Sequence, residues 1–300
     1  MSRRAQRSPL NPLWIGLAAP GMAWMALFFV VPFYAVAAVA FGQVDPILRT
    51  AIPEWNPQYW DFTSFSEVLD RVVGGDLRTV FLRTGAYVIL AVLGCVAIGY
   101  PVAYFVSRHS GRWRATLLAL MILPFWVSYL MRMLAWFNLL QPEGWVARAL
   151  SVLPGDDRPW LNGQPSTVVF GLIYGYVPFF ILPLYATLDR IDGRLLEAAR
   201  DLGATSNQAF RRVTLPLSRQ GLIAASVITA LPMVGDYYTN DLLSASPRTE
   251  MVGNQIVGYL QQSSQPQIGA SLVLILAVLL LIVMAGYLVS VNRAQKLVTR

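Results

Sequence analysis

The 300-residue sequence has almost none of the side chains that enzymes commonly use for catalysis or metal binding. It contains one cysteine (Cys95), one histidine (His109) and one lysine (Lys296). A single cysteine excludes an intramolecular disulfide and a thiolate metal site, and a single histidine excludes any site that needs two imidazoles. The lysine follows VNRAQ instead of a glycine-rich turn, so the chain carries no phosphate-binding P-loop of the Walker A type. We therefore expect no catalytic residues, no metal site and no ATPase site.

Charged residues are also scarce, at 13% of the chain against 56% hydrophobic residues, which excludes an ordinary soluble domain. Apolar stretches long enough to cross a hydrocarbon core, which takes about 20 helical residues, occur repeatedly. The first stretch is much longer than the apolar region of a signal peptide, which is about 7–15 residues, so we interpret it as an uncleaved span. The sequence predicts an all-α membrane protein with six transmembrane helices. Their expected bounds are 14–41, 84–107, 115–140, 166–188, 221–243 and 268–291.

The basic residues are concentrated on one side of these spans. The segments 1–13, 108–114, 189–220 and 292–300 hold 15 of the 23 Lys and Arg residues but only four of the 16 acids. The positive-inside rule therefore predicts that both termini and the 189–220 loop are cytoplasmic, flanking a transmembrane domain at 14–291. The net charge of +7 is thus a sign of orientation in a lipid bilayer, and we expect no nucleic-acid partner.

Two polar segments between the spans are predicted to be helical. On the outer side, Ser64 and Glu67 have capping-box spacing and indicate a short surface helix. In the 189–220 loop, apolar residues at helical spacing precede Gly203, which suits the end of a helix. Thr205 or Ser206 can cap a second helix, and we expect Pro216 to stop it. The apolar residues of the first helix are Leu195, Leu196, Ala198, Ala199 and Leu202.

The stretch EAARDLGATSNQAFRRVTLP at Glu197–Pro216 resembles the EAA loop of permease subunits of bacterial ABC importers. That pattern is E-A-A, a glycine four residues after the last alanine, an aliphatic residue and L-P, and no position departs from it. The matching residues are Glu197, Ala198, Ala199, Gly203, Val213, Leu215 and Pro216. The resemblance implies an ABC importer type I permease fold in a bacterial inner membrane. The alternative is an amphipathic surface loop without a partner.

The resemblance also implies which proteins and which residues work with this chain. Two copies of a separate ATPase would dock on the loop, a second, related permease would complete the pathway, and an extracytoplasmic substrate-binding protein would deliver the cargo. ATP and Mg belong to the ATPase, so this chain needs no cofactor of its own. The expected ATPase-coupling residues are Glu197, Ala198, Ala199, Asp201, Gly203, Phe210, Arg211, Leu215 and Pro216.

Three further stretches resemble spermidine/putrescine-type permeases: Leu123–Leu140, Gly235–Leu243 and Met251–Ile256. They imply a polyamine as the cargo. Permeases for iron, thiamine, phosphonate and sulfate belong to the same broad group and stay open as alternatives. A secondary transporter driven by an ion gradient is a weaker alternative, because it predicts inverted repeats and paired acidic residues, and neither is visible.

Ionisable residues inside spans cost free energy and usually serve function. At about 1.5 Å per residue along straight helices, Arg132 and Asp236 lie at similar depth, and we expect them to pair within the bundle or across the subunit interface. Asp236 with nearby aromatic rings would suit a cationic substrate, and Pro232 with Gly235 predicts a broken helix. A structural ion pair or snorkelling is the alternative. The candidate substrate-pathway residues are Arg132, Trp136, Asp236, Tyr237, Tyr238 and Asn240.

Overall fold

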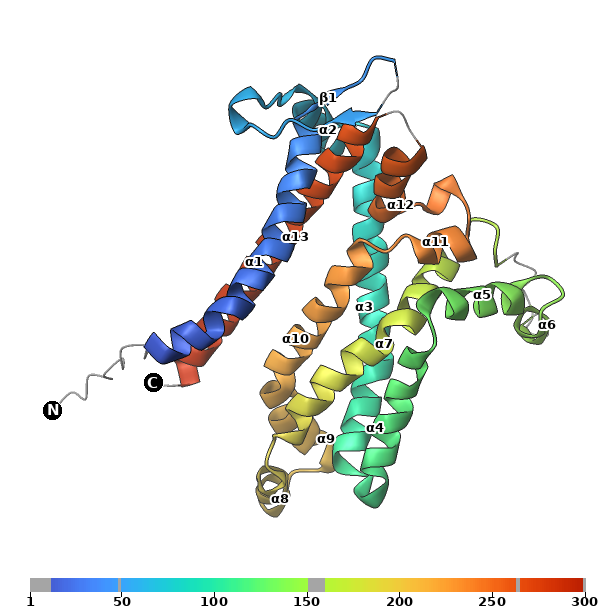
Figure 1. Cartoon of the computed structure of the whole chain (residues 1–300). Helices are drawn as coiled ribbons and strands as arrows, with labels where there is room; N and C mark the ends of the chain where they lie inside the picture. Colours follow the sequence, from blue (N-terminus) through green and yellow to red (C-terminus); the bar gives the residue numbers. More distant parts are fainter. Residues whose placement is uncertain (1–11, 48–49, 151–159, 263–264, 299–300) are drawn as a thin grey trace. The chain divides into compact units, whose positions relative to one another are not determined.

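The computed structural model describes residues 12–47, 50–150, 160–262 and 265–298, and it is drawn in Figure 1. Apart from the two-residue strands β1 (Gln43–Val44) and β2 (Ala51–Ile52), the regular structure described is helical, which confirms the all-α prediction. Five of the described helices are long and apolar enough to cross a membrane, and a bent pair makes six if it counts as one span. The predicted N-terminal segment 1–13 lies almost wholly outside the described residues.

The chain forms two compact units. The first comprises Met1–Leu69 with Tyr259–Leu276, and the second comprises Asp70–Gly258 with Ala277–Arg300. Helices α2 (Thr63–Val73) and α13 (Pro266–Val298) contribute to both. Shorter elements are α6 (Trp145–Leu150), α8 (Gly193–Asp201), α9 (Ser206–Ala209), α12 (Val252–Val257), the 3₁₀ turns Pro57–Tyr59, Gly111–Trp113 and Pro247–Thr249, and the π-helical segments Phe210–Thr214 and Gly258–Gln262.

The first unit packs α1 (Pro12–Ala40) against the start of α13 through small side chains. Ala37, Ala40 and Phe41 form a core with Ala270 and Leu274. The Gln267 amide donates to the carbonyl of Gly42 at 2.9 Å, which secures the end of α1. The helix bounds agree with the predicted first span to within two residues.

A short helix, α2, is present where the sequence predicts one, but it begins differently. It starts at Thr63, whose N–H and hydroxyl both donate to Asp61 Oδ1, at 2.9 and 2.7 Å. These two hydrogen bonds lower the pKa of Asp61, because they stabilise its charged form. The expected start at Ser64 with Glu67 is therefore wrong, since the side chain of Asp61 already binds the first turn of the helix.

The second unit is built on three long helices, α3 (Asp76–Arg108), α7 (Pro165–Asp189) and α10 (Leu215–Val234), which pack against one another (Figure 1). Their core is apolar, with Leu172, Phe180, Leu184 and Met233 fully buried. Helix α3 begins eight residues before the predicted second span, because the amphipathic turn from Asp76 to Arg83 continues the helix beyond the apolar stretch.

The third predicted span is not a straight helix. It consists of α4 (Arg114–Ile122), a 3₁₀ turn at Leu123–Trp126 and α5 (Tyr129–Leu140), with a bend of 87° between the two halves. Pro124 lacks an N–H and lies in the 3₁₀ turn, and Val127 is extended, so the α-helical hydrogen-bond ladder ends there. The bent pair occupies the predicted span, but the depth of Arg132, which assumed a straight helix, cannot be counted along it.

The fifth span is broken where Pro232 and Gly235 predict it. Helix α10 ends at Val234, and α11 (Tyr238–Leu243) starts after a three-residue break. The Asn254 amide donates to the carbonyl of Tyr237 at 3.0 Å, which also accepts the N–H of Asp241, and to Asp241 Oδ1 at 2.6 Å. Helix α12, which carries Asn254, therefore holds the start of α11 next to the break.

Two glycines on α7 let the broken helices approach its backbone. A Cβ on Gly171 would lie 2.6 Å from side-chain atoms of Thr239 and Leu243, and a Cβ on Gly175 would lie 2.5 Å from the ring of Tyr129. The spacing of these glycines is the small-xxx-small pattern of closely packed membrane helices. Close packing here brings α5 and α11 to the same face of α7.

We predict that Gly175→Ala destabilises the protein by about 1–3 kcal/mol, because the Tyr129 ring must move to accommodate the methyl group. The midpoint of thermal unfolding in detergent measures this. Gly85→Ala on α3 is the matched control, since a Cβ there meets nothing within 4 Å. Equal midpoints for the two variants would contradict the packing described.

Candidate functional site

The 189–220 loop forms two short helices joined at Gly203, as predicted. Asp192 caps α8 by accepting the N–H of Arg194 at 3.0 Å. Gly203 has φ +85°, in the left-handed region that favours glycine, and its N–H donates to the carbonyl of Arg200 at 2.8 Å. Because a Cβ on Gly203 would meet nothing within 4 Å, the backbone conformation alone requires glycine here.

The second helix does not end at Pro216. Thr205 and Gln208 form a reciprocal capping box at the start of α9. From there the chain continues through the π-helical segment Phe210–Thr214 directly into α10, with Pro216 in its first turn. A proline removes one i→i−4 hydrogen bond, and the wider π-helical turn before it accommodates this loss. The expected stop at Pro216 is therefore wrong, and the loop is joined continuously to the fifth span.

Helix α8 has one buried apolar residue and an exposed apolar face. Leu196 is buried, whereas Leu202 is 89% exposed. Glu197 is exposed on the same helix, and its carboxylate makes no hydrogen bond or ion pair with any residue that the structure describes. The apolar face has the spacing i, i+3, i+4, i+7 and consists of the half-buried Ala199 and the exposed Leu195, Ala198 and Leu202, the last of which is the C-cap residue just after α8.

A hollow of about 340 Å³ adjoins this exposed face. Its lining comes from both short helices and the turn between them: Ala199, Leu202, Gly203, Ala204, Gln208, Ala209, Arg212 and Val213. Of the predicted coupling residues, Ala199 and Gly203 line this hollow. Asp201 and Arg211 are exposed beside it, and Leu215 and Pro216 are exposed on the first turn of α10.

Phe210 does not belong to that surface. Its ring meets the rings of Tyr100 at 5.7 Å and Tyr104 at 5.3 Å, both edge-on, so it packs against α3. Among the predicted coupling residues, Phe210 therefore anchors the loop from inside.

A second polar site surrounds Asp236 in the break between α10 and α11. Asp236 is 7% exposed. Its Oδ2 accepts the hydroxyls of Tyr176 at 2.9 Å and Tyr129 at 3.1 Å, and its Oδ1 accepts the N–H of Thr239 at 2.9 Å. The Thr239 hydroxyl lies within hydrogen-bond distance of the Tyr129 oxygen and can donate to it, which leaves the Tyr129 proton for Asp236. The carboxylate is thus held by neutral donors.

Arg132 and Asp236 do not pair within this chain, contrary to the first of the two predicted arrangements, and pairing across a subunit interface stays a prediction. The Arg132 guanidinium lies over the Tyr129 ring, 5.5 Å from its centroid. Its buried Nε has no acceptor among the described residues. The bend before α5 is the physical reason, because it places the aromatic ring of Tyr129 between the two charges. Arg132 therefore contacts the Asp236 site only through Tyr129.

The other predicted pathway residues are dispersed. Trp136 packs edge-on against the ring of Phe170 on α7, with the two ring centroids 4.6 Å apart. The rings of Tyr237 and Tyr238 contact each other in a tilted arrangement, with centroids 4.0 Å apart, and Tyr238 is 41% exposed. Asn240 is buried, and its Oδ1 has no hydrogen bond in the part of the chain described.

Sequence reasoning missed the partners of Asp236. Tyr129 and Tyr176 come from α5 and α7, which are 107 and 60 residues away along the chain. Asn254, which holds the backbone of the break, was visible only as part of a resembling stretch. The available signal was the pair Gly171 and Gly175, whose spacing indicates that another helix packs closely there.

Comparison with known proteins found a matching protein family and similar sequences. Residues 95–296 match the sequence model of the family described as binding-protein-dependent transport system inner membrane component. The spermidine/putrescine transport system permease protein PotB of Haemophilus influenzae is 34% identical over 281 residues, which cover 93% of this chain and 92% of that protein. PotB of Escherichia coli strain K12 is 31% identical, covering 78% and 82%.

A solved structure has a similar fold. A chain of a bacterial alginate ABC transporter, in complex with an alginate-pentasaccharide-bound periplasmic protein, superimposes with a TM-score of 0.71 at 20% identity. The match covers 92% of both chains.

We predict that Tyr176→Phe and Tyr129→Phe each lower the free energy of unfolding by roughly 1–3 kcal/mol, because a buried carboxylate loses a donor. Tyr174→Phe, on the same helix α7, is the control, since its hydroxyl has no hydrogen bond to the residues described. Chemical unfolding in detergent measures all three. Equal effects in the three variants would mean that the hydroxyls do not hold Asp236.

Proposed function

The chain belongs to the family of binding-protein-dependent transport system inner membrane components, and from this premise we propose that it is one permease subunit of a bacterial ABC importer for polyamines. It would reside in the inner membrane as a multi-pass protein. Six spans with one coupling loop, which is the 189–220 loop, would form half of a translocation pathway, and a second, related permease would complete it. The observation that carries the proposal is the exposed apolar face of α8 beside the hollow at Gly203.

The exposed face of α8 suits a protein partner. A leucine that is 89% exposed on a short, capped helix costs solvation free energy unless another surface covers it. Small alanines on the same face allow a partner helix or groove to come close. The unpaired carboxylate of Glu197 and the exposed guanidinium of Arg211 supply charges for a complementary rim.

An ATPase is the partner that we infer. The chain has no P-loop, so ATP and Mg would be held by separate subunits, two copies of which dock beneath the pair of permeases. Closure of the ATPases around ATP would move the coupling loops and favour one orientation of the bundle, and hydrolysis would reset it.

The site at Asp236 supports a cationic cargo. A buried carboxylate without a cationic partner among the described residues attracts a positive charge in surroundings of low polarity. Its oxygens have about four lone-pair positions, and the three hydrogen bonds described leave room for one further donor. The rings of Tyr129, Tyr176 and Tyr237 supply aromatic faces next to it, which favour ammonium groups.

Cargo would come from a substrate-binding protein on the outer face, at the segments 42–82, 141–165 and 244–267. The relatives named for spermidine and putrescine support a polyamine for this chain. The rival is the same importer architecture for another small solute, in which Asp236 has a structural role only.

We predict that Leu202→Asp abolishes co-purification of the ATPase with this chain, because it places a charge on the most exposed leucine of the apolar face. Glu197→Gln should weaken the association of the ATPase with this chain. Asn207→Asp is the control, since this exposed residue of the same loop lies outside the hollow. The measurement is the amount of ATPase subunit that elutes together with this chain when the chain is purified through a tag. Retention of the ATPase by Leu202→Asp at the level of the control would refute the docking surface.

Gly203→Ala should also reduce ATPase association and coupled hydrolysis, because a left-handed alanine costs roughly 1–2 kcal/mol. Gly258→Ala is the matched control, since a Cβ there also meets nothing within 4 Å and its φ is ordinary. Substrate delivery and the yield of folded protein should not change in either variant.

The cargo is tested by uptake of radiolabelled spermidine into cells that depend on this chain. We expect Asp236→Asn to lower the initial rate by about tenfold, since a hydrogen bond to a charged group contributes roughly 1.5–3 kcal/mol. Asp70→Asn, an exposed acid on α2, should transport normally. If spermidine uptake does not depend on the chain at all, the polyamine proposal fails and the importer proposal stands.

A further inference from the structure

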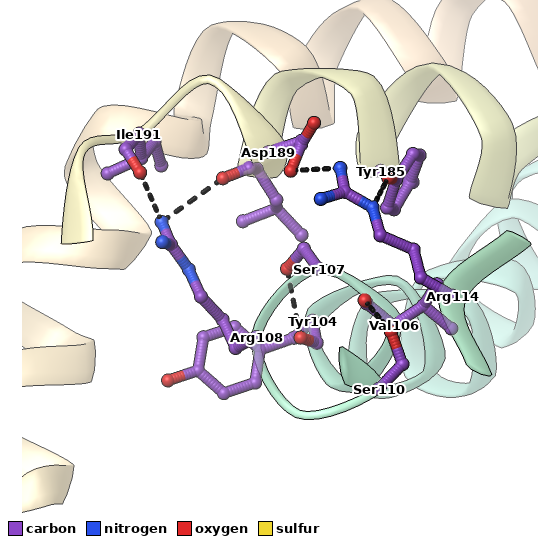
Figure 2. A network of polar contacts seen from close by, with 10 residues as sticks. Tyr104, Val106, Ser107, Arg108, Ser110, Arg114, Tyr185, Asp189 and Ile191 are labelled. Atoms are coloured by element: carbon purple, nitrogen blue, oxygen red, sulfur yellow. Dashed lines mark hydrogen bonds and ion pairs between the residues drawn. The ribbon is translucent and has the colours of Figure 1, made fainter. Parts of the chain in front are cut away.

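The cytoplasmic end of α3 holds the point where the coupling loop begins. Arg108, the last residue of α3, donates through Nη2 to the carbonyls of Leu188 at 3.1 Å and Ile191 at 2.8 Å (Figure 2). These carbonyls flank the end of α7, where backbone acceptors have no helical partner. A guanidinium satisfies both acceptors and carries the positive charge that a helix C-terminus favours. Asp192, which caps α8, is the next residue.

Arg114, at the start of α4, holds the same end of α7 from the other side. It forms an ion pair with Asp189 and donates from Nε to the hydroxyl of Tyr185 (Figure 2). Its guanidinium also lies over the Tyr185 ring, 5.1 Å from the centroid. The two arginines thus leave the start of the loop little freedom to move independently of the α3–α4 turn.

Helix α3 also holds the far end of the loop. The rings of Tyr100 and Tyr104 on α3 contact Phe210, and the Tyr100 hydroxyl lies 2.7 Å from the Ser218 hydroxyl on α10. A displacement of α8 therefore reaches α3 through two attachments, one before α8 and one after it.

At its other end, α3 holds the segment that stabilises the break at Asp236. Arg83 donates to the carbonyls of Arg248 at 2.6 Å and Glu250 at 2.8 Å. The N–H of Val252 donates to the Thr84 hydroxyl at 3.0 Å, at the start of α12. From α12, Asn254 reaches the backbone of Tyr237, the neighbour of Asp236.

Packing between α3 and α7 makes this connection stiff. A Cβ on Gly99 would lie 2.5 Å from the Phe180 ring, and one on Gly94 would overlap Ile173, so the two helices are in close contact along their length. Close-packed elements transmit a displacement instead of absorbing it.

We propose that α3 transmits movement of the coupling loop to the polar site at Asp236, and that Arg108 is the positioning residue that joins α3 to the loop. This inference rests on the proposed docking of an ATPase at α8. Arg108 contacts neither the docking face nor Asp236 in the structure. Its role is to make α7, the loop and α3 move as one body when the ATPases close.

A cysteine probe at the far end of α3 tests this transmission. Cys95, the only native cysteine, is buried, so Tyr238→Cys introduces an accessible thiol close to Asp236. The intact transporter is isolated through a tag on this chain, and the rate of modification by a charged thiosulfonate is measured without nucleotide and after trapping with ATP and vanadate. With Arg108 present, trapping should change the rate by at least about fivefold, the low end of typical coupling.

Arg108→Ala should abolish the nucleotide dependence of the modification rate while the ATPase still co-purifies and hydrolyses ATP. Arg108→Lys, which keeps one donor to the carbonyls, should restore part of it. Arg112→Ala is the matched control, because Arg112 belongs to the same basic loop and its guanidinium lies over Trp113, 5.6 Å from the centroid.

The outcomes separate the two proposals. No ATPase with the wild-type chain means that the proposed function fails. An ATPase that binds, with a modification rate that does not respond to trapping or responds equally in Arg108→Ala and Arg112→Ala, overturns the role of α3. Loss of the ATPase from Arg108→Ala alone also overturns it, since Arg108 would then support docking instead of transmission.

Discussion

Close packing of α3 against α7 is the constraint on which the second unit depends. Two glycines on α3 remove the side chains that would keep the backbones apart, and Phe180 and Ile173 on α7 fill the space that Gly99 and Gly94 leave. On α7, Gly171 and Gly175 accommodate Tyr129 and Thr239. Helix α7 therefore supports the polar site at Asp236 near the middle of its length, and it ends where the coupling loop begins.

The polar site supplies hydrogen-bond partners that apolar surroundings do not offer. A helix that breaks in a membrane protein exposes backbone groups that need partners, and here Asp236 accepts the N–H of Thr239 in the first turn after the break. Asp236 is stabilised in turn by two tyrosine hydroxyls instead of an arginine. The hydrogen bonds that hold this carboxylate therefore all come from neutral donors on three different helices.

The coupling loop combines firm attachment with an uncovered face. Leu196 and Phe210 anchor it, whereas Leu195 and Leu202 on α8 are exposed. A short helix of this kind has little stability by itself, so its caps and its two attachments to α3 determine its position. A partner that covers the exposed face can thus act on the whole helix pair α3 and α7.

Several properties were predictable from the sequence because they depend on local pattern. Hydropathy located the spans, the glycine at 203 ended α8, and Pro232 with Gly235 broke the fifth span. The EAA pattern pointed to the family. Only the tertiary structure decided that Arg132 lies on Tyr129 instead of pairing with Asp236, and that Arg108 binds carbonyls 80 and 83 residues away. The physical reason is that charge and hydropathy along the sequence indicate which groups need a partner. Helix bends and close helix packing determine which partner each group contacts.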